Sequence, residues 1–189
     1  MSTNIAMEQR KRIHPSKFTL WVAIGSMIMM FAGLTSAYVV KRSMPSWTTF
    51  EMPHIFWYST AVMVISSLTM FMALRAFKQR ERVKYRSLLT LTAILGVAFI
   101  IMQVIGFSQI WATGITFAGS GAGQFLYIIA GLHGIHVLGG VIALIIMFFK
   151  AFSTRMRNYN AVPVEVMSTY WHFVDFLWLY LLVFFMLMQ

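Results

Sequence analysis

The stretch YWHFVDFLWLY, residues 170–180, places one imidazole and one carboxylate near the start of an apolar run that covers 168–189. A charged group inside a bilayer-spanning helix costs several kcal/mol unless it is paired, hydrated or neutralised. Residues three and four apart share a helix face, so His172, Asp175 and Trp178 form one stripe. We expect this stripe to face protein and not lipid.

The composition is that of a membrane protein. Of the 189 residues, 59% are hydrophobic and 11% are charged, whereas soluble domains contain about 25% charged residues. The net charge of +10 does not indicate a nucleic-acid partner, because the basic residues lie between long apolar runs and not along one face. The chain has no cysteine, which excludes disulfides and thiolate metal sites.

Five apolar runs follow a polar tail at residues 1–17. They cover about 18–40, 55–74, 87–111, 123–149 and 168–189. About 20 apolar residues span the hydrocarbon core as a helix. The N-terminus lacks the pattern of a cleaved signal peptide, so the first run is expected to remain as a helix. The sequence therefore predicts an all-α, polytopic membrane protein: a bundle of five transmembrane helices forming one membrane domain.

The basic residues predict the orientation of this bundle. Five spans place the tail and the segments 75–86 and 150–167 on one side, and these hold thirteen of the fifteen Lys and Arg residues. The other side holds Lys41 and Arg42. Because cytoplasmic loops carry an excess of Lys and Arg, we expect the N-terminus inside and the C-terminus outside.

Two histidines, His133 and His136, share one face of the fourth span. They could ligate a metal or haem, or they could hydrogen-bond across a close-packed helix interface. His136 lies 14 residues before Lys150, about 21 Å from that end of the span, whereas His172 should lie about 6 Å from the same side. This difference of about 15 Å argues against one haem iron held by both residues and favours packing.

Asp175 admits three interpretations: a proton relay, a counter-ion for a cation, or a member of a buried polar network with His172. Since no second carboxylate lies within the spans, a proton path wholly within this chain is disfavoured and the structural network is favoured. Hydroxyl and amide side chains of the second and third spans could supply partners. We assign no catalytic residue and no metal ligand, and the expected polar network comprises Glu165, His133, His136, His172 and Asp175.

Three regions resemble subunit III of the haem-copper respiratory oxidases. The first is the last span, with Glu165 seven residues before His172. The second is GLHGIHV, residues 131–137, which is similar to the family's GFHGLHV. The third is weaker and consists of FAG at 31–33, EMP at 51–53 and Ser59-Thr60. Five spans resemble the short bacterial form of the family, which lacks the first two helices of the seven-helix form.

This resemblance implies a non-redox accessory subunit in the cytoplasmic membrane of a bacterium. It implies packing against catalytic subunit I, which carries the haems and copper, and contact with other subunits of a cytochrome c or quinol oxidase. It also implies bound phospholipid and support for proton uptake and turnover stability. The chain departs from the family at Met27, which stands where the long form has an intramembrane glutamate.

Two other functions are compatible with five apolar spans. The first alternative is a haem-binding membrane anchor of the cytochrome b type, for which His133 and His136 would be the candidate ligands. The second is a small transporter. The two intramembrane imidazoles and one carboxylate are fewer polar groups than a transport path would be expected to need.

Overall fold

The computed structural model describes residues 15–43, 52–115, 121–152 and 161–188, and its regular elements there are all helices. These are α2 (Pro15–Arg42), α3 (Ile55–Lys78), α4 (Arg82–Ala112), α5 (Gly121–Phe152) and α6 (Val162–Leu187). Within these ranges, five helices are long and apolar enough to cross a membrane. The predicted all-α, five-span fold is confirmed. Most of the expected tail, and Glu51 of the third motif, lie outside the described ranges.

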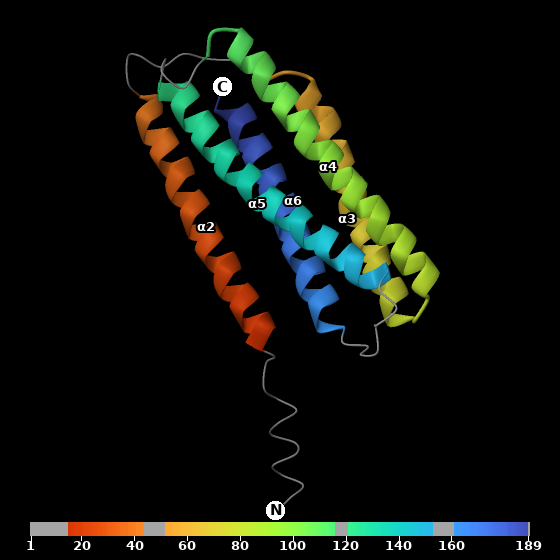
Figure 1. The fold of residues 1–189 in the computed structure, drawn as a ribbon. Helices are drawn as coiled ribbons and strands as arrows, with labels where there is room; N and C mark the ends of the chain where they lie inside the picture. Colours follow the sequence, from red (N-terminus) through yellow and green to blue (C-terminus); the bar gives the residue numbers. More distant parts are fainter. Residues whose placement is uncertain (1–14, 44–51, 116–120, 153–160, 189) are drawn as a thin grey trace, which may run out of the picture.

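Consecutive helices run in opposite directions and form one elongated bundle (Figure 1). The helices α3 and α4 lie side by side as a hairpin, and α2 lies on the opposite flank of the bundle with α5 and α6 between (Figure 1). The last helix contacts α2, α3 and α5, while α2 and α3 do not touch within the described residues. One strip of α6 therefore faces outward between α2 and α3.

The helices extend beyond the apolar runs. The last one begins at Val162, with Pro163 and Glu165 in its first turn. Proline suits a first helical turn because the N–H groups of that turn have no acceptor within the helix. A carboxylate there lies near the positive end of the helix dipole. The basic segment 75–86 is mostly helical, since α3 ends at Lys78 and α4 begins at Arg82. Arg80 makes the turn between them with a φ of 60°.

Trp171 of α6 packs where α4 and α5 approach each other. It is fully buried, and its ring lies between Gly96 of α4 and Gly140 of α5. A Cβ at Gly96 would lie 2.9 Å from Trp171 Cη2, and one at Gly140 would lie 3.0 Å from Trp171 Cζ3. Both positions therefore require glycine for the indole ring to fit. By contrast, a Cβ at Gly131 would meet nothing within 4 Å.

Candidate functional site: the polar contacts of α6

The polar side chains of α6 bind mainly to hydroxyl groups of α3. The pairs are Trp171 Nε1 donating to Ser66 Oγ at 3.1 Å, Trp178 Nε1 donating to Thr60 Oγ1 at 3.0 Å, and His172 Nδ1 sharing a hydrogen bond with Ser67 Oγ. In lipid no water competes for these groups, so helix–helix hydrogen bonds fix the register of the two helices. These three pairs hold α6 against α3 over about two helical turns.

Contacts at both ends of α6 tie it to α2. At the start of the helix, Glu165 pairs with Lys17 at 2.7 Å and with Lys78 at 2.8 Å, so one carboxylate bridges α2, α6 and α3. Towards the other end, Tyr180 and Thr35 share a hydrogen bond of 3.0 Å between their hydroxyl groups. Because α2 and α3 do not touch, α6 is the element that joins them.

Asp175 lies in the middle of α6 and is 4% exposed. Neither of its carboxyl oxygens has a hydrogen-bond partner in the part of the chain that the structure describes. Ser67 lies beside it, but its hydroxyl group is shared with His172. The structure therefore brings His172 and Asp175 to the same region of α3 without a direct bond between them.

The two histidines of α5 differ in their surroundings. The ring of His133 is 1% exposed and stacks on Trp178, with centroids 5.3 Å apart and planes inclined by 26°. The edges of Phe31 and Phe99 enclose it further. His136 is half-buried, and its Nδ1 bonds to the carbonyl oxygen of Leu132 in its own helix at 2.7 Å. Both ring nitrogens of His133 lack a hydrogen-bond partner in the described ranges. The two rings therefore pack against aromatic side chains without the expected hydrogen bond to a neighbouring helix.

The expected depth difference of about 15 Å between His136 and His172 is too large. Tyr170 donates a hydrogen bond of 2.9 Å to the carbonyl oxygen of His136, and its ring borders Gly140, so this part of α6 lies beside the stretch of α5 from His136 to Gly140. The reason is that α6 begins at Val162, before the apolar run, which moves His172 deeper. Instead, the two imidazoles contact different helices. His172 bonds to α3, and the ring of His136 contacts Phe31 of α2. Within the described residues, no group of three or more potential ligands could hold a metal ion.

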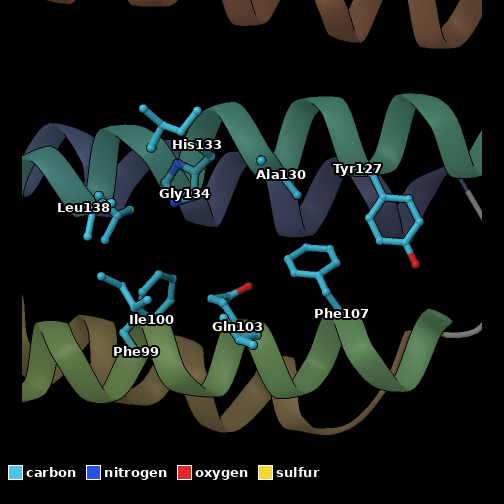
Figure 2. Close-up of a pocket in the computed structure, with 13 residues that line it drawn as sticks. Phe99, Ile100, Gln103, Phe107, Tyr127, Ala130, His133, Gly134 and Leu138 are labelled. Carbon is cyan, nitrogen blue, oxygen red and sulfur yellow. The ribbon is translucent and has the colours of Figure 1, made fainter. Parts of the chain in front are cut away.

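A groove of about 410 Å³ runs between α4 and α5. Figure 2 shows Gln103 and Phe107 of α4 facing Ala130 and Tyr127 of α5 across it. The amide Nε2 of Gln103 donates to Ser59 at 3.0 Å, while its Oε1 is buried without a partner in the described ranges. His133, whose two ring nitrogens have no hydrogen-bond partner in the described ranges, also lines the groove, and most of the remaining lining is apolar.

Sequence reasoning missed three features of the site. The indole N–H groups of Trp171 and Trp178 act as interhelical donors, whereas only Trp178 was placed on the stripe expected to face protein. The signal was available, because these residues sit seven apart on one face of α6. Gly96 and Gly140 had no visible partner in the sequence, since the ring that fills the space between them comes from a distant segment. The pairing of Glu165 with two lysines could not be predicted, because it depends on how three helices are placed relative to one another.

The fold and these contacts define a multi-pass helical membrane protein whose last helix binds the others together. Residues 16–188 match the family model described as cytochrome c oxidase subunit III. The chain belongs to the cytochrome c oxidase subunit III family.

Named relatives support the same family. The chain is 29% identical over 181 residues to a probable cytochrome c oxidase subunit 3 of Nocardia farcinica, covering 89% of each chain. It is 27% identical over 166 residues to cytochrome c oxidase subunit 3 of Bacillus sp., covering 85% of this chain and 80% of the relative. With the counterpart in Pisaster ochraceus it shares 34% identity over 123 residues, which is 65% of this chain and 46% of the relative. Membership of the family implies a complex with other oxidase subunits.

Proposed function

We propose that this chain is the non-redox accessory subunit of a proton-pumping terminal oxidase in a bacterial cytoplasmic membrane. In this role it packs against the catalytic subunit, holds lipid at its flank, and supports proton uptake and stability through repeated turnovers. The observation that carries the proposal is the family match over nearly the whole described chain. The packing of His133 among aromatic rings and the bond of His136 to its own helix support a subunit that leaves redox chemistry to its partner.

Two largely apolar grooves support the lipid-holding part of this role. The first is the groove of about 410 Å³ between α4 and α5. The second, of about 700 Å³, lies where α2, α5 and α6 meet and is lined by Leu20, Ala143, Met147 and Val166 among others. Glu165 and its two lysine partners lie at the same end of α6 as this second groove. Acyl chains in such grooves would fill space that side chains leave open.

Met27 bears on how proton uptake would be supported. It is buried in α2 at 7% exposure, in a helix that carries no acidic residue. Asp175 is the one acidic residue in the middle of a described helix, and it is enclosed by the bundle. The supporting effect would therefore come from covering the partner and holding lipid, and not from protonation along this chain.

Removing this chain from the purified complex tests the proposed function. The haem spectrum of the remaining complex should be unchanged, because the haems would lie in the partner. Oxygen consumption should decay faster over repeated turnovers and should fall more steeply as the pH rises. Activity that decays identically with and without the chain would contradict the supporting role. Haem retained by this chain alone would favour the cytochrome b-type anchor instead.

We also propose the orientation with the N-terminus inside, which rests on the thirteen Lys and Arg residues of one side. The chain has no cysteine, so a single introduced cysteine is a unique label. Cysteines placed at Arg80 and at Gly121 lie at opposite ends of α4 and its connection to α5. In intact cells an impermeant thiol reagent should label the second position and spare the first. Labelling of Arg80→Cys from outside would contradict this orientation.

A further inference from the structure

Among the outward-facing surfaces of the bundle, the strip of α6 between α2 and α3 is distinguished by an imidazole. We name it the α6 strip, and it consists of His172, Phe176, Leu179 and Val183. These residues are spaced by three and four and therefore share one face. Phe176 is 70% exposed, Val183 is 53% exposed and Leu179 is 37% exposed, and His172 is half-buried.

His172 lies within the hydrocarbon region. It is ten residues after Val162, the first residue of α6, which places it about 15 Å along the helix. Glu165, which pairs with two lysines, marks the polar end of α6. His172 lies seven residues further along, about 10 Å deeper by the helical rise, and within the apolar run 168–189. A polar group in contact with lipid tails at that depth is costly, because nothing there can hydrogen-bond to it.

Ser67 satisfies one nitrogen of this imidazole. Nδ1 of His172 bonds to Ser67, and Nε2, on the other side of the half-buried ring, makes no hydrogen bond to the described part of the bundle. Two exposed serines within the spans differ from His172 in this respect. Ser26 and Ser108 bond to carbonyl oxygens of their own helices, which is how serine is satisfied in apolar surroundings.

The exposed face of α4 has the character of a lipid-facing surface. On α4, Ile94 is 60% exposed and Ile101 is 54% exposed, and they lie seven residues apart on one face. The two faces are thus similar in exposure and different in chemistry. A face that places an imidazole in the membrane interior fits protein, and a face of isoleucines fits lipid.

We propose that the α6 strip docks a transmembrane helix of a partner oxidase subunit. That helix would present a hydrogen-bonding side chain opposite Nε2 of His172 and apolar side chains opposite Phe176 and Val183. This inference rests on the proposed function for the identity of the complex and adds the face and the chemistry of the contact. The network of His172 and Ser67 would then continue across the subunit boundary.

Site-specific photo-crosslinking in the intact membrane complex tests the docking face. A benzophenone amino acid replaces Phe176 in one variant and Ile101 in the matched control, which are both exposed positions on helices. The variant at Phe176 should crosslink to a different polypeptide, and the control should crosslink to lipid. Crosslinking of Phe176 to lipid alone, or to a second copy of this chain, would overturn the proposal.

Substitution of His172 tests the hydrogen bond across the interface. His172→Leu should reduce the partner retained per chain in detergent by about three- to tenfold, the range of a membrane hydrogen bond, and His172→Gln should retain it better. The thermal midpoint of each purified variant separates loss of docking from loss of fold. Equal retention by the Leu and Gln variants would overturn the role of His172. If the variant at Phe176 crosslinks to a different polypeptide but the purified complex carries no haem-copper spectrum, the proposed function fails and the docking face stands.

Discussion

Replacing Trp171 with alanine is expected to lower the free energy of unfolding of the isolated chain in detergent by about 2–4 kcal/mol. The indole ring is fully buried, it fills the space between Gly96 and Gly140, and its Nε1 donates to Ser66 of α3. Its loss leaves a cavity where three helices meet. Apolar transfer contributes little within a membrane, so the expected loss comes from packing contacts and the hydrogen bond.

The matched control is Trp21→Ala, because Trp21 is 64% exposed on α2. It removes the same side chain without opening a cavity in the bundle. Its unfolding free energy should change by less than about 0.5 kcal/mol, as is usual at exposed positions. Similar losses in the two variants would contradict the view that Trp171 holds α4 and α5 together. The measurement is reversible unfolding in mild detergent, followed by tryptophan fluorescence of the remaining residues.

The sequence was sufficient to predict the five spans, because each apolar run is long enough to cross a bilayer and is bounded by charged or polar residues. It also identified α6 as the helix with the most unusual polar content. Helix ends were harder to predict from the sequence, since the composition around Pro163 and Glu165, in the first turn of α6, is typical of a loop. Apolar length reports the hydrocarbon thickness, whereas the helix continues into the headgroup region where charged residues are tolerated.

The sequence predicted which types of side chain would bind the polar groups of α6, but not which residue would pair with which. Hydroxyl groups of α3 and Gln103 of α4 were expected to serve α6, and the structure places Thr60, Ser66 and Ser67 against it. Gln103 instead donates to Ser59. Which hydroxyl meets which donor depends on the rotation and depth of each helix, and these are set by packing. The fit of Trp171 against two glycines is the packing feature that fixes them.

Asp175 illustrates the remaining limit of sequence reasoning. Its intramembrane position was visible at once, but the environment of its two oxygens was not. The structure places it beside Ser67, whose hydroxyl is already shared with His172. Burying a carboxyl group costs free energy unless hydrogen bonds offset it, and both oxygens of Asp175 lack such a partner in the described ranges. Its contribution to the assembled complex remains a prediction.

Gly96→Ala is expected to lower the free energy of unfolding by about 1–3 kcal/mol through overpacking. The added methyl group would lie 2.9 Å from Trp171 Cη2 and 3.1 Å from Val141 Cγ2. The indole ring cannot move away easily, because Gly140 borders its other side and Ser66 holds its Nε1. Gly131→Ala is the matched control, since a Cβ there meets nothing within 4 Å. It should be neutral or slightly stabilising, because alanine forms helices more readily than glycine.

A double-mutant cycle identifies the ring as the cause. Trp171→Phe shortens the side chain and removes the indole atoms that the new methyl group would meet, so the double variant with Gly96→Ala should lose less stability than the two single variants together. The expected coupling is about 0.5–3 kcal/mol, and Gly131→Ala combined with Trp171→Phe should show none. Additive losses in the first pair would mean that Gly96 is required by its own helix and not by the indole. Coupling confined to Gly96 would establish that the YWHFVD stretch fixes the spacing of α4 and α5 as well as its own attachment to α3.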